Sequence, residues 1–311
     1  MSNLPLTFIA CCYNEAENIP ALLNEIERTM SNSELDWNVL LVDDGSWDDS
    51  AALIAQLSET KKYLKYLCLT RNFGKEAAIC AGLDAIVEGR AALLLDADGQ
   101  HPMDAVLPMI EKLRAGADMV VAVPNERASG IFNKAFSRAY HWFIKLSTRQ
   151  EITHGGGDFR LLNSKQVKRI KLMREHVRYM KGLYSYPGGR IETVKYQERP
   201  RPNGKSTFSL ASKVRLAIDG IISFTTMPLR AFFVIGLMVL VVSAVYLIYI
   251  LFEIALYGRS APGFASLLFS IMVLNGLIMV QVGVQGEYIA QLLKEVKQRP
   301  IYLVDEEQSK L

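Results

Sequence analysis

The stretch "LLLDADGQHP", Leu93 to Pro102, indicates which class of fold this chain adopts. An apolar run from Ala91 to Leu95 ends in two carboxylates one residue apart, Asp96 and Asp98. Short, wholly apolar runs are typical of parallel strands, because such strands are buried on both faces. Ligands of parallel sheets bind at the carboxyl ends of the strands. The stretch therefore predicts an α/β domain with a site at Asp96 and Asp98.

The segments around this stretch repeat the alternation of apolar strand and helix. Strands are expected over residues 6–12, 37–44, 64–70, 91–98 and 118–123. Helices are expected over residues 15–30, with Asn14 as the N-cap, and over 48–59, 75–89 and 103–116. This alternation predicts a Rossmann-like, mostly parallel sheet that is covered by helices on both faces.

Two uncharged apolar runs, Phe232–Phe252 and Phe264–Val284, follow this domain. Each is long enough to cross a hydrocarbon core of roughly 30 Å as a helix, although a pair of buried core helices is the alternative. Basic residues precede the first run and follow the second, whereas the connecting loop holds only Arg259. This bias places the N-terminal domain and the C-terminus in the cytoplasm. A net charge of +3 gives no argument for nucleic acid.

These features predict four parts of the chain. Residues 1–205 form the cytoplasmic catalytic domain, and residues 206–228 form amphipathic helices at the membrane interface. Residues 229–290 form a two-helix transmembrane domain, and residues 291–311 form a cytoplasmic tail.

The carboxylate pair at the end of the fourth strand points to a cation. Asp96 and Asp98 repel each other unless a cation lies between them, and oxygen ligands favour Mg²⁺ or Mn²⁺. Gln100 adds a neutral oxygen, and His101 is a softer neighbour. Taken alone, the motif fits equally well a solvated turn in which Asp98 caps the next helix.

Three further strand ends carry polar side chains. In "VDDGS", a carboxylate can accept hydrogen bonds from a nucleobase or ribose, or the motif is only a tight turn. Tyr13 of "YNE" stacks on a base or simply packs. Arg71 to Lys75, "RNFGK", brings cations suited to a diphosphate, or begins a solvated helix. Because all four ends meet at one sheet edge, their combination favours a nucleotide site.

Several longer motifs carry a family resemblance, and they are "CYNEAENI", "LLVDDGSWDDS", "LTRNFGKEAAICAGLDA", "LLLDADGQHP" and "GDFRLLNSK". With the two apolar runs, they resemble the family 2 glycosyltransferases that act on polyprenyl phosphates. The most similar group is the bactoprenol glucosyltransferases of O-antigen-modifying phages and bacteria. The resemblance implies a GT-A catalytic domain, interfacial amphipathic helices and two transmembrane helices. It also implies a metal-dependent, inverting enzyme of the bacterial inner membrane that assembles as a tetramer.

The resemblance also assigns roles to residues. Asp96 and Asp98 would bracket the metal and the diphosphate, with Gln100 as a further ligand. The uridine would be held by Tyr13, Glu15 and Asp44, and Lys75 would lie on the nucleotide side. Asp158 of "GGGDFR" falls where relatives place an acid near the acceptor, so that it is a candidate base, an orienting group for Arg160, or purely structural.

A lipid-phosphate acceptor has less need of a general base than a sugar hydroxyl acceptor would have. A lipid phosphate is already largely ionised at neutral pH, so it needs cations more than a general base. The candidates are Arg127, which we also take as catalytic, Lys134, Arg138, Arg199, Arg201 and Lys205. The chain departs from the family pattern at Cys11, Gly99, His101, Pro124, Lys205 and Thr207, and an arginine often stands at the position of Pro124.

We therefore expect transfer of a hexose, glucose from UDP-glucose, to undecaprenyl phosphate at the cytoplasmic membrane face. The product would serve in modification of a cell-surface glycan. The alternatives are the same reaction with GDP-mannose, UDP-N-acetylglucosamine or an aminoarabinose donor, and a non-catalytic membrane scaffold.

Overall fold

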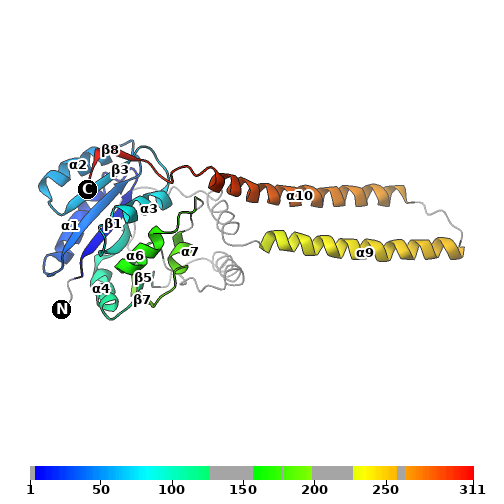
Figure 1. Cartoon of the computed structure of the whole chain (residues 1–311), viewed down its shortest axis with the longest axis horizontal. Helices are drawn as coiled ribbons and strands as arrows, with labels where there is room; N and C mark the ends of the chain where they lie inside the picture. The colour runs from blue at the N-terminus through cyan, green and yellow to red at the C-terminus, as the bar shows by residue number, and fades with distance from the viewer. Residues whose placement is uncertain (1–3, 126–156, 177, 179, 198–226, 258–262) are drawn as a thin grey trace. The chain divides into compact units, whose positions relative to one another are not determined.

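A mixed β-sheet with helices on both faces forms the larger of the two units into which the chain divides (Figure 1). The computed structural model describes residues 4–125, 157–176, 178, 180–197, 227–257 and 263–311. The larger unit contains Met1–Leu210 together with Arg299–Leu311, and the smaller unit contains Ala211–Gln298. The C-terminal residues thus belong to the same unit as the N-terminus.

The sheet has eight strands in the described part of the chain. They are β1 (Leu6–Cys12), β2 (Trp37–Asp43), β3 (Leu64–Leu69), β4 (Ala91–Asp96), β5 (Met119–Pro124), β6 (Arg160–Leu162), β7 (Ile191–Tyr196) and β8 (Val304–Lys310). Their order is β7-β5-β6-β4-β1-β2-β3-β8. The pairs β1–β2, β1–β4, β2–β3 and β5–β7 are parallel, whereas β6 and β8 run antiparallel to their neighbours. The predicted Rossmann-like α/β sheet is confirmed in its parallel centre, β4-β1-β2-β3, and the sheet as a whole is mixed.

The helices of the larger unit cover both faces of the sheet. They are α1 (Ile19–Met30), α2 (Ser50–Thr60), α3 (Lys75–Ala85), a short 3₁₀ helix η1 (Met103–Ala105), α4 (Val106–Arg114), α6 (Ser164–Lys171) and α7 (Met180–Ser185). Side chains of α1, α2 and α4 pack into one buried cluster, and those of α3, α6 and α7 pack into another. Strand β4 supplies Leu93 and Leu95 to the first cluster and Ala92 and Leu94 to the second, since successive side chains of a strand point to opposite faces.

The first helix begins later than the sequence predicts, so the expectation that Asn14 caps it is wrong. Helix α1 starts at Ile19, with Asn18 at the N-cap position and a proline in its first turn. Asn14 instead has a φ of 55°, in the left-handed region that asparagine tolerates. Its side chain accepts the backbone N–H of Trp47, and its own N–H donates to Ser46 Oγ. Asn14 thus ties the end of β1 to the loop after β2.

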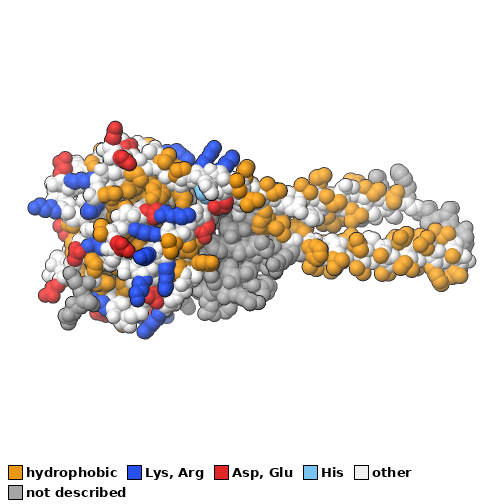
Figure 2. Space-filling view, in the orientation of Figure 1, with side chains coloured by type: hydrophobic (Ala, Val, Ile, Leu, Met, Phe, Trp, Pro, Cys, Tyr) orange, Lys and Arg blue, Asp and Glu red, His pale blue; other side chains and the backbone are white. Residues whose placement is uncertain are grey.

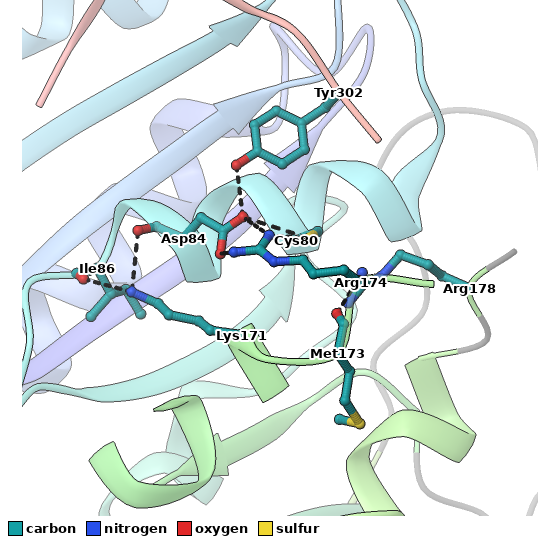
Figure 3. A network of polar contacts seen from close by, with 8 residues as sticks. All are labelled: Cys80, Asp84, Ile86, Lys171, Met173, Arg174, Arg178 and Tyr302. Carbon is teal, nitrogen blue, oxygen red and sulfur yellow. Dashed lines mark hydrogen bonds and ion pairs between the residues drawn. The ribbon is translucent and has the colours of Figure 1, made fainter. Parts of the chain in front are cut away.

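The C-terminal residues contribute a strand that the sequence did not predict. Strand β8 pairs with β3, and the N–H of Thr70 donates to the carbonyl of Leu303. The Tyr302 hydroxyl donates to Asp84 Oδ2 at 2.7 Å, and Arg174 donates to both oxygens of the same carboxylate (Figure 3). Asp84 therefore joins the C-terminal segment, the end of α3 and the chain after α6.

The smaller unit contains two long apolar helices, α9 (Met227–Tyr257) and α10 (Phe264–Val296). Hydrophobic side chains lie along the surfaces of both (Figure 2). Of the described helices, one meets the length and composition of a membrane span: Ala231–Leu256, with a mean hydropathy of 2.8. Both apolar runs of the sequence are therefore helical. By length and composition, the helix that contains the first run qualifies as a membrane span.

The close approach of the loop after β2 to the loop after β3 generates a stability prediction. Gly45 has a φ of +66°, and an added Cβ would lie 2.3 Å from the backbone carbonyl carbon of Arg71. We expect Gly45→Ala to lower the free energy of unfolding by more than about 1 kcal/mol, because the φ strain adds to a clash with backbone.

Gly116→Ala is the matched control for this substitution. Gly116 has a φ of +96°, but no atom lies within 4 Å of the added Cβ, so only the φ strain is introduced. Thermal denaturation of the purified full-length chain measures both variants. Equal losses of stability would contradict the proposed clash.

Candidate active site

The carboxyl ends of the central parallel strands bring the sequence motifs together. In the sheet register, Cys11 of β1 lies beside Asp96 of β4, and Cys12 lies beside Asp43 of β2. The segment that follows β1 therefore lies between the "DADGQ" and "VDDGS" motifs. The expectation that these motifs meet at one edge of the sheet is confirmed.

Lys75, the first residue of α3, forms the electrostatic centre of this edge. Its Nζ lies 2.6 Å from Asp96 Oδ1 and 2.7 Å from Asp158 Oδ2. Burial acts to lower the pKa of Lys75, but the charges of Asp96 and Asp158 outweigh it and raise this pKa. The ammonium group is therefore charged, and it holds together two carboxylates that would otherwise repel each other.

The turn after β4 presents further oxygen atoms. Asp98 Oδ1 accepts the N–H of Gln100 at 3.1 Å, so Asp98 stabilises its own turn and does not cap the next helix, whose N-cap position is Pro102. Within the described residues, no group of three or more His, Cys, Asp or Glu side chains is arranged to hold a metal ion. Asp96, Asp98 and Gln100 nevertheless carry side-chain oxygen atoms, whose chemistry suits a hard divalent cation.

Asp44 holds the loop that leads into α3. It is buried, and its two carboxylate oxygens accept the N–H groups of Phe73 at 2.8 Å and Gly74 at 2.9 Å. Burial raises the pKa of Asp44, and these two hydrogen bonds act in the opposite direction. Asp44 thus fixes the position from which Lys75 extends. Its expected contact with uridine stays a prediction.

The segment after β1 offers an exposed ring and an acidic side chain. Tyr13 is 42% exposed at the sheet edge, which leaves its ring accessible to a ligand. The carboxylate of Glu15 accepts a hydrogen bond from the side chain of Asn18, and the backbone N–H of Glu15 donates to Ser50 Oγ. The predicted roles of both residues in holding uridine are untested. Trp47, which the sequence did not single out, is 80% exposed on the neighbouring loop.

Asp158 and Arg160 lie at the start of β6, antiparallel to β4. Arg160 is fully buried, its Nε donates to the carbonyl of Gly157 at 2.9 Å, and its guanidinium carbon lies 4.6 Å from the centre of the Tyr184 ring. Asp158 reaches Lys75, as described above. The structure thus places Asp158 beside the "DADGQ" motif, a contact that no local pattern in the sequence indicates.

The predicted acceptor-phosphate cations lie outside the described residues. This applies to Arg127, Lys134, Arg138, Arg199, Arg201 and Lys205. Pro124, where the family often has an arginine, ends β5. The described part of the candidate site comprises Lys75, Asp96, Asp98, Gln100 and Asp158.

Comparison with known proteins places this site in a family. The family model described as glycosyl transferase family 2 matches residues 7–170, which include all five of these residues. The chain is 34% identical over 310 residues to the bactoprenol glucosyl transferase of Shigella phage SfV, covering 99% of this chain and 100% of that protein. It is 34% identical over 304 residues to the prophage bactoprenol glucosyl transferase homolog of Escherichia coli K12, covering 97% and 98%.

Among solved structures, glucosyl-3-phosphoglycerate synthase from Mycobacterium tuberculosis, in complex with Mn²⁺, UDP-glucose and glycerol 3-phosphate, has a TM-score of 0.47 at 14% identity. The match covers 69% of this chain and 76% of that one. Membership rests on the family model and on the full-length relatives. The chain belongs to glycosyl transferase family 2, and it is a glycosyltransferase.

Proposed function

We propose that this enzyme transfers glucose from UDP-glucose to a polyprenyl phosphate at the cytoplasmic face of the bacterial inner membrane. The observation that carries the proposal is the cluster of Lys75, Asp96 and Asp158 at the carboxyl edge of the sheet. It lies beside the oxygen-rich turn of Asp98 and Gln100. The names of the relatives, which match nearly the whole chain, support the choice of sugar and acceptor.

The donor side suits a sugar diphosphate together with Mg²⁺ or Mn²⁺. Asp96, Asp98 and Gln100 would hold the ion, which typically takes the rest of its ligands from water and substrate phosphates. The bound ion would stabilise the negative charge on the departing nucleoside diphosphate. Lys75 supplies a second cation on the same side, from a position fixed by Asp44.

The charge of the acceptor phosphate bears on the role that we propose for Asp158. A polyprenyl phosphate is already ionised, so its attack on the sugar requires no proton acceptor. Asp158 forms an ion pair with Lys75, so its carboxylate is already engaged by a cation. We therefore assign Asp158 to positioning Lys75. Inversion follows from a single displacement in which the phosphate oxygen bonds to the anomeric carbon as the diphosphate leaves.

The path of the chain supports two membrane crossings. Strand β8 pairs with β3, so residues 304–310 lie on the same side of the membrane as the sheet. If α9 carries the chain across, the chain must cross again before Val304 in order to return. Helix α10 lies between these points, and its first 21 residues are uncharged. The domain boundaries at residues 205, 228 and 290 and the tetramer implied by the resemblance stay predictions.

The direct test is product analysis with membranes that contain the full-length chain. Incubation with labelled UDP-glucose is expected to give a labelled lipid whose mass is that of polyprenyl phosphate plus one hexose. GDP-mannose and UDP-N-acetylglucosamine serve as competing donors. A labelled lipid from one of these donors alone would change the assigned sugar, and no labelled lipid from any donor would favour a non-catalytic scaffold.

Removing the charge of Asp98 should abolish most of this activity. Asp98→Asn keeps the size of the side chain and an oxygen for the Gln100 N–H, but removes the negative charge that the ion requires. We expect kcat to fall by about 100-fold or more, on the scale of losing one major transition-state contact. Asp104→Asn, an exposed residue of η1, is the matched control. Full activity of Asp98→Asn at saturating Mn²⁺ would contradict the metal role.

A double-mutant cycle tests whether Asp158 acts through Lys75. Lys75→Met and Asp158→Asn should each lower kcat/KM by about 10- to 100-fold, because each removes a partner of the same ion pair. The double variant should be no slower than Lys75→Met alone. Losses that multiply would instead support an independent role of Asp158 as a base.

Cysteine labelling tests the membrane topology. Gly263→Cys, at the N-cap of α10, should react with a membrane-impermeant maleimide in intact cells. Leu311→Cys, at the exposed C-terminus, should react only after the membrane is opened. The unmodified chain gives the background, since Cys12, Cys68 and Cys80 are buried and Cys11 is partly buried. Labelling of both positions in intact cells would contradict the topology.

A further inference from the structure

His101 lies directly beneath the carboxylate turn and bonds to its backbone. The side chain is only 8% exposed, and its Nδ1 accepts the backbone N–H of Asp96 at 3.1 Å. Because Nδ1 is the acceptor, the ring proton must lie on Nε2. Burial lowers the pKa of His101, although Asp96 and Asp98 oppose this, and the neutral ring is the form that can accept this bond. The N–H of Asp96 is thus satisfied by a side chain five residues further along.

The same ring contacts the segment that carries Asp158. His101 stacks on Phe159 with ring centres 4.7 Å apart and an angle of 14° between the planes. Tyr196, the last residue of β7, meets both rings edge-on, at 6.2 Å from His101 and 5.7 Å from Phe159. Phe159 is fully buried and follows Asp158 in the chain. The ring of His101 therefore connects the end of β4 with the start of β6 and the end of β7.

The expectation that His101 is a softer neighbour of the metal stays a prediction, and the structure shows what its two nitrogens contact. Its Nδ1 is engaged by the Asp96 N–H, and its Nε2 lies 4.0 Å from Asp96 Oδ2, beyond hydrogen-bonding distance. Nδ1 is therefore bonded to the backbone of the site, and Nε2 lies near the Asp96 carboxylate without a hydrogen bond to it. The residue acts on the backbone of the site.

We infer that His101 is a positioning residue, which holds the Asp96 backbone by its Nδ1, whereas its ring only packs against Phe159. These two segments carry the carboxylates that meet at Lys75, 2.6 and 2.7 Å from its Nζ. The hydrogen bond of His101 thus fixes the backbone from which one of these two carboxylates extends. Small shifts of groups that support a site are known to weaken ligand binding strongly. The inference depends on the proposed function only for its binding and activity measurements.

Two substitutions separate the hydrogen bond from the ring. Phenylalanine at this position keeps a ring for Phe159 but leaves the Asp96 N–H without an acceptor. Asparagine lacks the ring but places its Oδ1 close to the position of Nδ1. We expect His101→Phe to weaken Mn²⁺-dependent UDP binding by about 10-fold or more, the usual effect of losing a supporting contact. His101→Asn should stay within about threefold of the unmodified chain, as expected for a retained hydrogen bond.

Hydrogen exchange tests the contact without metal, donor or turnover. In the metal-free, full-length chain, the amide of Asp96 should exchange faster in His101→Phe than in the unmodified chain, and His101→Asn should restore its protection. Calorimetry with UDP and Mn²⁺ then measures the consequence for binding. Because the exchange measurement needs no substrate, failure of the proposed glycosyl transfer would leave it unaffected.

Leu113→Ala is the control for a general loss of stability. Leu113 lies on α4 in the same buried cluster as Phe159, but it belongs to no loop of the site. The Leu113→Ala substitution should lower the melting temperature and leave UDP binding unchanged. The inference is overturned if His101→Phe retains both the protection of Asp96 and the UDP affinity. It is equally overturned if His101→Asn loses as much as His101→Phe.

Discussion

The ion pairs of Lys75 are the interaction on which the site depends. Asp96 and Asp158 arrive from strands that run in opposite directions, β4 and β6, and like charges do not remain adjacent without a cation. The ammonium group is delivered by the first turn of α3, whose entry loop is held by Asp44. The Nζ atom of Lys75 therefore depends on four parts of the chain. They are the start of α3, the end of β4, the start of β6 and the buried carboxylate of Asp44.

Much of this arrangement follows from local sequence patterns. The apolar runs of β1 to β5 and the helices between them are predicted because burial on both faces leaves a strong compositional signal. The positions of Asp96, Asp98 and Lys75 at one edge follow from parallel topology alone. The pairing of Lys75 with Asp158 does not, since these residues are far apart in sequence and nothing local specifies that β6 inserts beside β4.

Other features leave a weak signal or a misleading one. Strand β8, "VDEEQSK", is polar and mostly exposed, so it lacks the alternation that marks a half-buried strand. Asn14 precedes a helix-like stretch, but the proline at position 20 sets the start of α1. Asp44 and His101 lie in motifs that suggest ligand binding, and both accept hydrogen bonds from backbone N–H groups of the loops around the site. A sequence motif thus locates a site, but it does not distinguish the residues that hold the backbone of the site from those that would contact a ligand.

The return of the chain to form β8 has a consequence for how the protein folds. Strand β3 is the penultimate strand of the sheet, and its outer edge stays unpaired until β8, Val304–Lys310, has been synthesised. An open strand edge is a template for pairing with other chains. In the proposed topology, both membrane helices are inserted before that edge is covered. Every copy of the chain therefore passes through a stage in which the sheet is incomplete and the open edge of β3 can pair with another chain.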